Sequence, residues 1–255
     1  MKIENYGVGE RCAEVMRRLL VSEARGEISK SISRIILLPI PTSRDKVHIT
    51  GTDKLLSEAV SGACQSDAVF GYGIPKSVRA EMERAGALVF DVLECEDFQR
   101  ENAYITALGT IGYILTEIKE IPSSLSFGIV GYGRIGKELI RLLLFLGARV
   151  RVYTSKELTR IELGECGVET SLTDYRSKID LDGIDVLINT APTDLSSSFP
   201  LGACGVRIIE LASGNNFGDT EVTRLMSIPD KMYPKSAGAA YFRAIEKHIK
   251  EVKEI

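Results

Sequence analysis

Histidine is scarce in this chain, and its scarcity narrows the chemistry that the protein could perform. His48 and His248 are the only two among 255 residues, and neither sits near a second good metal ligand. A metal site is therefore not expected, and we place His248 at an exposed or half-buried position on the last predicted helix. Ser-His-Asp catalysis is also excluded, because no histidine ends a predicted strand in the second half of the chain.

An excess of positive charge and a long apolar run are also missing. The formal net charge is −3, so a nucleic-acid partner is not expected. The longest apolar runs, at 35–41 and 142–148, fall far short of the roughly 20 residues that cross a membrane. Residues 1–15 contain no apolar segment of the signal-peptide kind. We therefore expect a cytoplasmic protein that binds no membrane.

The cysteines give no sign of a disulfide framework or of a metal-binding pair. They are odd in number, scattered along the chain and never arranged as CxxC. This pattern is typical of free thiols in a reducing cytoplasm. The five are Cys12, Cys64, Cys95, Cys166 and Cys204.

Predicted strands and helices alternate through the first hundred residues, which indicates a parallel sheet. Short apolar runs bounded by Gly or Pro predict the strands, and apolar residues at helical spacing predict the helices. The strands are expected within 34–41, 66–75 and 87–94, and the helices within 12–24, 53–60 and 75–86.

A long helix is predicted to join this region to the next. Residues 103–119 contain few helix-breaking residues and carry apolar side chains at helical spacing. Pro122 disfavours helix at Ile121, and the polar residues that follow resemble a linker. We therefore predict an α/β domain over residues 1–100 and a linking helix over 101–122.

Strand and helix alternate again after the linker, as in a doubly wound domain. We predict a nucleotide-binding Rossmann domain over 123–235 and a C-terminal helix, 236–255, that packs back on the first domain. The fold class that follows is α/β, with two Rossmann-like doubly wound parallel-sheet domains joined by a long helix. Strands are expected within 127–130, 149–153, 185–192, 206–213 and 231–234, and helices within 134–148, 155–167 and 219–227.

A glycine motif at the start of the second domain predicts a dinucleotide site. Gly131, Gly133 and Gly136 form G-x-G-x-x-G between an apolar strand and a helix. The first glycine permits a tight turn, the second lets the backbone approach a pyrophosphate, and the third lets helix and strand pack closely. The helix N-terminus offers N–H groups to the phosphates, and Arg134 could add a bidentate contact or simply be solvated. The predicted cofactor-binding residues of this turn are Gly131, Tyr132, Gly133, Arg134, Ile135 and Gly136.

The end of the second strand of this domain favours NADP over NAD. In NAD sites an acid about 20 residues past the glycines usually binds the ribose 2′-hydroxyl. Thr154, Ser155 and Lys156 stand at that place, and the first carboxylate is Glu157. Hydroxyls and a lysine can bind a 2′-phosphate that an acid would repel, so NADP is the preferred cofactor and NAD the alternative. Lys156 could equally be a solvated residue in the first turn of a helix.

Two further segments follow strands of the same sheet, at the carboxyl ends where open α/β sheets bind ligands. Both could line the nicotinamide half of the cofactor. Alternatively, Pro192 only ends its strand, and Ser213 with Gly214 only forms a turn. The predicted contacts are Asn189, Thr190, Ala191 and Pro192 in one segment and Leu211, Ala212 and Ser213 in the other.

Several phrases occur in an order that resembles the A subunit of dipicolinate synthase, over roughly residues 35–247. The resemblance implies two Rossmann-like domains, related in architecture to D-2-hydroxyacid dehydrogenases. It also implies NADP-dependent oxidation of a dihydrodipicolinate-type intermediate to pyridine-2,6-dicarboxylate, with a flavoprotein-like B subunit, during spore formation. The phrases are ENAYITALGTIGYIL, GIVGYGRIGKEL, DVLINTAP, IIELASGNNFGD and YPKSAGAAYFRAI.

The chain departs from the family pattern in the half that would bind substrate. The family phrase N-x-x-P-T-x-E-G keeps Asn102 and Thr106, but Ile105 replaces the proline and Leu108 replaces the acid. The Gly-Gly-Asp turn expected after the first strand is altered at residues 7–10. The resemblance is therefore strong for the cofactor half and weak for the substrate half.

Four residues are candidates for catalysis: Asn102, Thr106, Lys235 and Ser236. Lys235 could pair with a substrate carboxylate, act as a base if burial depressed its pKa, or be a surface lysine. Thr106 and Ser236 stand near predicted helix starts and could only cap them. The histidine acid–base pair of a D-2-hydroxyacid dehydrogenase is missing, but aromatising a dihydropyridine needs mainly positioning.

Two functions remain open on these grounds. The first is an NADP-dependent oxidoreductase of the dipicolinate synthase type, acting on a small carboxylic acid, with a B subunit as partner and as a homo-oligomer. The second is a non-catalytic NAD(P)-binding subunit or sensor, and a dehydrogenase-like relative acting on another small carboxylic acid is a variant of the first. The strand-end phrases favour the first function, whereas Leu108 and the altered first turn favour the second.

Overall fold

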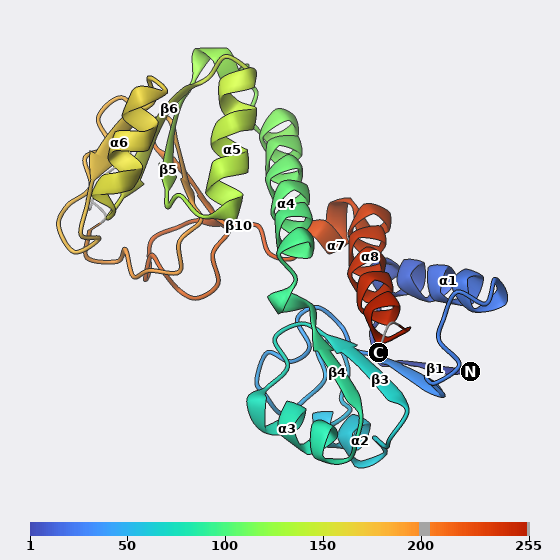
Figure 1. Cartoon of the computed structure of the whole chain (residues 1–255). Coiled ribbons are helices and arrows are strands. Elements are labelled where there is room, and N and C mark those ends of the chain that lie inside the picture. The colour runs from blue at the N-terminus through green and yellow to red at the C-terminus, as the bar shows by residue number, and fades with distance from the viewer. Residues whose placement is uncertain (199–204, 254–255) are drawn as a thin grey trace. The chain divides into compact units, whose positions relative to one another are not determined.

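The computed structural model describes residues 1–198 and 205–253, and it divides the chain into two compact units (Figure 1). Unit 1 comprises Met1–Asn102 and Pro229–Ile255, and unit 2 comprises Ala103–Ile228. Each unit contains one parallel β-sheet. The predicted α/β class with two parallel sheets is confirmed.

Unit 1 is built on a four-stranded sheet in the order β1-β2-β3-β4, in which every neighbouring pair is parallel. Strand β3 is buried along its whole length, as expected for a strand inside a parallel sheet. The strands are β1 (Lys2–Asn5), β2 (Arg34–Leu37), β3 (Asp67–Gly71) and β4 (Leu88–Asp91), and the connecting helices are α1 (Glu10–Ala24), α2 (Leu56–Ser61) and α3 (Lys76–Arg84).

The C-terminal helix α8 (Pro234–Lys253) belongs to unit 1 and packs against α1 (Figure 1). The two helices approach closely at Gly238, where a Cβ would lie 2.7 Å from the carbonyl oxygen of Arg11. Tyr241 of α8 is fully buried and donates a hydrogen bond to the Leu38 carbonyl at 3.1 Å. Small residues in the first half of α8 therefore let it seat on α1 and at the end of β2.

The long helix α4 (Glu96–Glu117) follows a single 3-10 turn, Val92–Glu94. It begins at Glu96 instead of the predicted residue 103, because its first turns are polar and lack the apolar spacing on which the prediction depended. Glu96 and Asp97 still favour a helix there, since acidic side chains stabilise a helix N-terminus. Ile111, Ile114 and Ile118 then pack in the core of unit 2.

Unit 2 is built on a six-stranded parallel sheet in the order β10-β9-β8-β5-β6-β7. The chain runs outward from β5 through β6 to β7, and then returns to the other side of β5 with β8. This is the Rossmann order, and its switch point lies between β5 and β8. The strands are β5 (Ser126–Val130), β6 (Arg149–Thr154), β7 (Glu169–Leu172), β8 (Val186–Asn189), β9 (Arg207–Glu210) and β10 (Thr223–Arg224), with helices α5 (Arg134–Phe145) and α6 (Glu157–Glu165) and a 3-10 turn at Pro122–Ser124.

Successive residues of β5 serve the cores on the two faces of this sheet. Phe127 and Ile129 pack with α4 and α5 on one face, and Val130 packs with Tyr153 and Leu187 on the other. Strand residues alternate between faces, so a strand with both faces covered must be apolar throughout. This explains why β5 and β8 were visible in the sequence as apolar runs.

Two predicted elements before the last helix were wrong. The predicted helix 219–227 is a loop with the two-residue edge strand β10, and the predicted strand 231–234 overlaps the short helix α7 (Ile228–Met232). Strand β7 was not predicted, because its residues are exposed or half-buried and show no apolar run. Pairing with β9 and β6 creates these edge strands, and that pairing has no local sequence signal.

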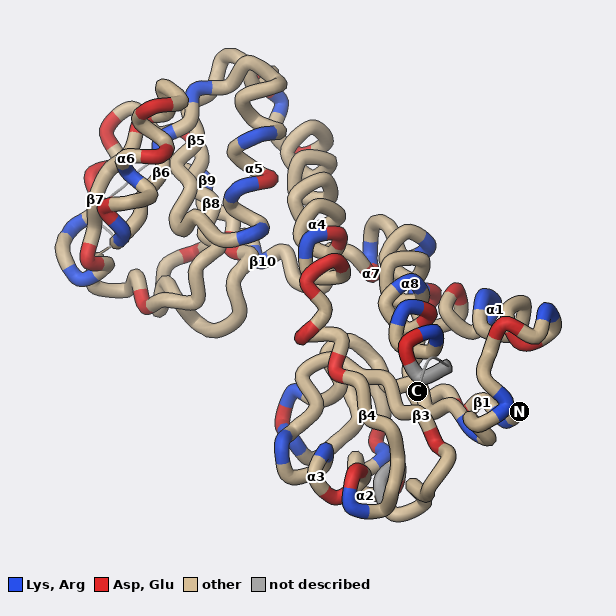
Figure 2. The backbone as a smooth tube through the Cα atoms, viewed as in Figure 1, with Lys and Arg blue, Asp and Glu red and all other residues tan. Residues whose placement is uncertain are grey.

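Lys and Arg are interspersed with Asp and Glu along the chain in both units, as the coloured backbone in Figure 2 shows. Among the described residues, no helix combines the length and apolar character needed to span a bilayer.

Candidate functional site

The glycine turn follows β5 and leads directly into α5. Gly131 has φ 93°, a left-handed conformation that favours glycine, and its N–H donates to the Tyr153 carbonyl of β6 at 2.9 Å. A Cβ on Gly131 would also lie 3.0 Å from Thr190 Oγ1, and a Cβ on Gly136 would lie 2.5 Å from the Gly131 carbonyl oxygen. The first and third glycines are therefore required by the protein's own backbone and packing.

Gly133 has a different environment from the other two glycines. Its φ of −82° is accessible to any residue, and a Cβ added to it would have no atom within 4 Å. Neither backbone strain nor packing requires a glycine here. Open space over a glycine at a helix start is what a pyrophosphate lying against the backbone would need.

The N-terminus of α5 has the features of an anion site. Gly133 is the N-cap and no side chain caps the helix, so its first N–H groups are not satisfied by a capping side chain. The helix starts at Arg134, whose side chain is exposed. Phosphate groups bind at such helix ends because free N–H groups and the helix dipole both favour negative charge.

Tyr132 connects the turn to α6. Its hydroxyl donates to Glu162 Oε1 at 3.1 Å, and Lys137 Nζ lies 4.5 Å from the centre of its ring. Burial and the neighbouring Glu162 carboxylate raise the pKa of Tyr132. The side chain thus serves as a neutral link between the turn and the helix that follows β6.

The end of β6 presents two exposed side chains and one buried one. Thr154 is 3% exposed, and its Oγ1 accepts the Lys156 N–H at 3.2 Å, which shapes the turn. Ser155 and Lys156 are exposed, and Lys156 is the N-cap of α6. Of the three predicted residues, Ser155 and Lys156 are therefore the ones whose side chains a ribose phosphate could reach.

Hydrogen bonds of buried polar groups fix the segments that follow β8 and β9. Asn189 is fully buried, and its amide group bonds to Glu210 and to the Ala191 N–H. Thr190 Oγ1 donates to the Val130 carbonyl at 2.8 Å, which joins this segment to the glycine turn. Burial raises the pKa of the Glu210 carboxyl, and its hydrogen bonds from Asn216, Ala212 and Asn189 oppose that rise.

The exposed residues of these segments are few. Pro192 and Ser213 are exposed, Ala191, Thr190 and Leu211 are partly buried, and Ala212 is buried with its N–H bound to Glu210. Asn189 and Ala212 therefore support the segments, and the exposed residues are the ones placed to face a ligand.

The four candidate catalytic residues are divided between the units. Asn102, Lys235 and Ser236 belong to unit 1, and Thr106 belongs to unit 2. Lys235 and Ser236 are exposed in the first turn of α8, so the burial that a lysine base would need is missing. Thr106 is buried within α4, where its carbonyl accepts from Thr110 Oγ1 at 2.9 Å, so the alternative in which it caps a helix start is wrong.

A buried charge that the sequence did not suggest lies beside Asn102. Arg11 is 3% exposed, and its Nη2 donates to Asn102 Oδ1 at 3.2 Å. Arg11 Nε lies 3.0 Å from Asp230 Oδ1, an ion pair without hydrogen-bond alignment. Burial lowers the pKa of Arg11 and raises that of Asp230. Arg11 is the second residue of α1, and nothing in the local sequence marks it as buried.

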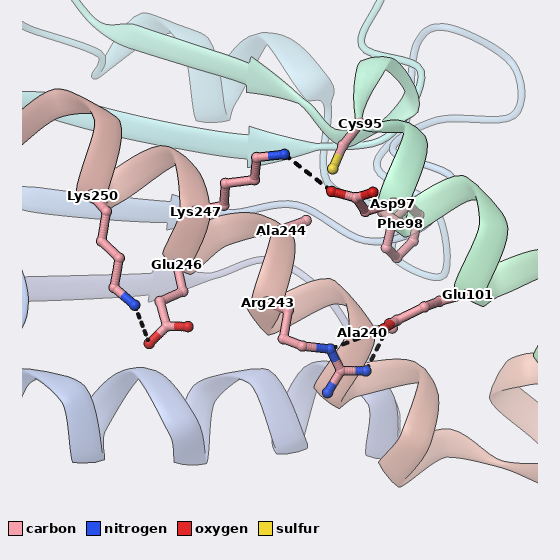
Figure 3. A pocket seen from close by; sticks show the side chains of 10 residues that line it. All are labelled: Cys95, Asp97, Phe98, Glu101, Ala240, Arg243, Ala244, Glu246, Lys247 and Lys250. Atoms are coloured by element: carbon pink, nitrogen blue, oxygen red, sulfur yellow. Dashed lines mark hydrogen bonds and ion pairs between the residues drawn. The ribbon is translucent and has the colours of Figure 1, made fainter.

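A pocket of about 380 Å³ in unit 1 lies between the start of α4 and α8 (Figure 3). Arg243 bonds to Glu101 at 2.7 Å, and Lys247 bonds to Asp97 at 3.0 Å. Phe98 and two alanines of α8, Ala240 and Ala244, form apolar parts of the pocket lining. The pocket contains none of the predicted site residues, and the ion pairs drawn in Figure 3 already join its acids to its bases.

The cysteines and possible metal ligands add no further site. Cys12 and Cys95 are buried and Cys64 and Cys166 are exposed, all as free thiols, while Cys204 lies outside the described residues. Burial raises the pKa of the Cys12 thiol to about 11. Among residues 1–198 and 205–253, no group of three His, Cys, Asp or Glu side chains is placed to hold a metal ion.

The fold is shared with solved structures that are distant in sequence. The A chain of dipicolinate synthase from Bacillus subtilis superposes with a TM-score of 0.77 and 18% identity, covering 100% of this chain and 97% of that one. The corresponding dipicolinate synthase chain from Bacillus halodurans gives 0.76 and 20%, covering 97% of each chain. An L-alanine dehydrogenase gives 0.54 and 14%, covering 100% and 90%. No family model and no curated protein sequence matches the chain, so these likenesses establish the fold.

Proposed function

We propose that this chain is an NADP-dependent oxidoreductase of the same type as the A subunit of dipicolinate synthase. In this role it oxidises a dihydrodipicolinate-like intermediate to dipicolinate in the cytoplasm of a spore-forming cell. It works as a homo-oligomer with a flavoprotein-like B subunit. Two lines of support are the ordered sequence phrases and the fold shared with two dipicolinate synthase structures over nearly their whole length.

The observation that carries the nucleotide-binding part of the proposal is Gly133. The fold itself does not require a glycine there, since its φ is ordinary and a side chain would meet nothing. A pyrophosphate lying against the start of α5 does require one, because a Cβ would occupy its place. The uncapped helix N-terminus supplies the N–H groups that would bind the phosphates.

The cofactor preference rests on the end of β6. Ser155 and Lys156 are exposed, and no acid precedes them at the strand end. The next carboxylate, Glu157, forms an ion pair with Arg160, which offsets its repulsion of a 2′-phosphate. Lys156 then neutralises the phosphate, and Ser155 donates a hydrogen bond to it.

The substrate half is proposed to lie in unit 1, within the domain predicted over residues 1–100. A bound NADP+ would accept the hydride that the dihydropyridine loses, and the proton released on aromatisation would pass to solvent. The chain's own residues then have only to bind and orient the substrate, because aromatisation drives the reaction. Asn102 is held by the buried Arg11, and Lys235 is a cation able to reach a carboxylate; both suit a small carboxylic acid.

Titration of the purified chain with NADPH and NADH, followed by an absorbance assay with NADP+ or NAD+ as the oxidant, tests this proposal. We expect tighter binding of NADPH and turnover of dihydrodipicolinate, either by the chain alone or after addition of a B subunit. Tight NADPH binding without turnover, both for the chain alone and with a B subunit, would contradict the enzyme hypothesis. The chain would then be a non-catalytic nucleotide-binding subunit. Failure to bind either nucleotide would overturn the whole proposal.

A non-catalytic NAD(P)-binding subunit or sensor is the second candidate, and a specific observation favours it. Leu108 replaces the family's acid on α4, and Lys235 is exposed, whereas a lysine base would be buried. A dehydrogenase acting on another small carboxylic acid would show turnover in the same assay with a different acid as substrate.

A further inference from the structure

A fully buried carboxylate stands at the end of β9 in unit 2. Glu210 Oε1 accepts hydrogen bonds from Asn189 Nδ2 at 3.0 Å and from the Ala212 N–H at 2.9 Å. Its Oε2 accepts a hydrogen bond from Asn216 Nδ2 at 3.2 Å. Burial of a carboxylate is unfavourable unless donors surround it, and here three donors do so.

These donors belong to two separate segments of the chain. Asn189 ends β8, and its Oδ1 also accepts the Ala191 N–H at 3.0 Å. Asn216 follows β9, and its backbone oxygen accepts the Leu195 N–H at 2.6 Å. Glu210 is therefore the centre of a buried network that ties loop 190–195 to loop 211–216.

A second set of hydrogen bonds holds the outer side of loop 211–216. Arg224 of β10 donates to the Gly214 carbonyl at 2.8 Å and to Asn215 Oδ1 at 2.6 Å. Loop 211–216 is thus fastened from inside by a carboxylate and from outside by a guanidinium. Hydrogen bonds on both sides are typical of a loop that must keep a single conformation.

The strand order indicates which part of a dinucleotide these two loops would contact. Strands β8 and β9 lie on the side of β5 opposite β6, and a dinucleotide crosses the switch point with one half on each side. The glycine turn and Ser155–Lys156 occupy the β5–β6 side, which leaves the other side for the nicotinamide. We infer that Glu210 is a positioning residue that holds loops 190–195 and 211–216 in the arrangement that receives the nicotinamide end. This inference rests on the proposed function, in which unit 2 binds NADP.

Glu210→Gln tests this role because it keeps the shape but turns one acceptor into a donor that opposes Asn216 or Asn189. We expect NADPH affinity to fall roughly tenfold or more, the loss typical of removing a supporting charged hydrogen bond. Adenosine 2′,5′-bisphosphate, which fills the adenine half alone, should bind as it does to the wild type. Glu221→Gln removes an exposed charge shortly after the same loop and should leave both affinities unchanged. Isothermal titration calorimetry measures all four cases.

Amide hydrogen exchange without ligand provides an independent readout. Exchange should rise over residues 190–195 and 211–216 in Glu210→Gln, and also in Asn216→Ala, which keeps the carboxylate but removes one donor. Equal loss of both ligands would indicate general destabilisation and overturn the role. Unchanged NADPH affinity in Glu210→Gln would overturn it while wild-type binding stands. A wild type that binds neither ligand overturns the proposed function and this role together.

Discussion

The three glycines of one motif are present for three different physical reasons. Gly131 needs its positive φ, and Gly136 needs to lie against the Gly131 carbonyl. Gly133 needs neither, and in the proposed function it is the glycine that lets a pyrophosphate approach the backbone. A motif match alone treats the three as equivalent, whereas the structure shows that the fold requires only the first and the third.

Gly133→Ala should therefore leave the fold almost unaffected while damaging binding. We expect the free energy of unfolding to change by less than about 1 kcal/mol, the scale of an N-cap substitution. NADPH affinity should fall more than about tenfold, because the new methyl group occupies the pyrophosphate position. Denaturant unfolding and calorimetric titration measure the two effects.

Gly136→Ala is the matched comparison for that variant. Its Cβ would lie 2.5 Å from the Gly131 carbonyl oxygen, so the turn must distort. Overpacking of this kind costs about 1–3 kcal/mol of stability. If Gly133→Ala were destabilised to the same degree, or bound NADPH normally, Gly133 would carry no information about a ligand.

Lys156→Asp tests the cofactor preference at the same scale. The substitution places a negative charge where a 2′-phosphate would lie, so NADPH binding should weaken more than NADH binding. Lys30→Asp makes the same charge change at an exposed site in unit 1 and should weaken neither. Equal losses for the two nucleotides in Lys156→Asp would remove the argument for NADP.

At the scale of single elements, helix α1 shows how ion pairs form between charged side chains of one helix. Glu14 accepts hydrogen bonds from Arg17 at 2.7 Å and from Arg18 at 2.6 Å, the spacing at which helix side chains meet. These bonds lower the pKa of Glu14 from 4.5 to about 2. The ionised carboxylate is thus favoured in the folded chain.

The sign of the pH effect follows from that direction. A depressed pKa stabilises the folded chain above pH 4.5, and the contribution is lost as the pH falls toward about 2. Glu14→Gln should lower Tm slightly at pH 7, and the difference from wild type should shrink across this window. Glu221→Gln, at an exposed carboxylate that lies outside the helices of the described chain, is the control and should show no such convergence. A Tm difference that is constant from pH 7 to 2 would contradict the assignment.

At the scale of the whole molecule, the chain leaves unit 1 after Asn102 and returns to it at Pro229. Unit 1 is therefore completed by the last segment of the chain, through the packing of α8 on α1. Each unit still contains apolar clusters of its own, among them one around β2, β3 and β4 in unit 1 and those on the two faces of the larger sheet in unit 2. A substitution that weakens the packing of α8 should therefore destabilise unit 1 before unit 2.

Gly238→Ala should loosen that contact. Its Cβ would lie 2.7 Å from the Arg11 carbonyl, and we expect a loss of about 1 kcal/mol or more despite the better helix propensity of alanine. Gly164→Ala in α6 meets nothing within 4 Å and should be neutral or stabilising. Hydrogen exchange should rise in α1 and α8 of Gly238→Ala while β5 is unchanged. Faster exchange in β5 would show that the two units do not unfold separately.

The sequence by itself determined the class of the fold, the buried strands and the place of the glycine turn. These follow from local rules, because a strand covered on both faces must be apolar and a tight strand–helix turn needs glycine. Edge strands β7 and β10 and the short helix α7 obeyed no such rule. Strand pairing or packing creates them, and neither leaves a periodic signal.

Tertiary structure alone decided which polar residues support the site and which can face a ligand. Asn189, Thr154 and Ala212 stand at strand ends in the sequence just as Ser155 and Ser213 do, yet the first three are buried and bonded inward. Glu210 and Arg11 were likewise indistinguishable from surface charges. Burial depends on segments distant in the chain, so a charged residue's role becomes visible only when the partners that desolvate and bind it are in place.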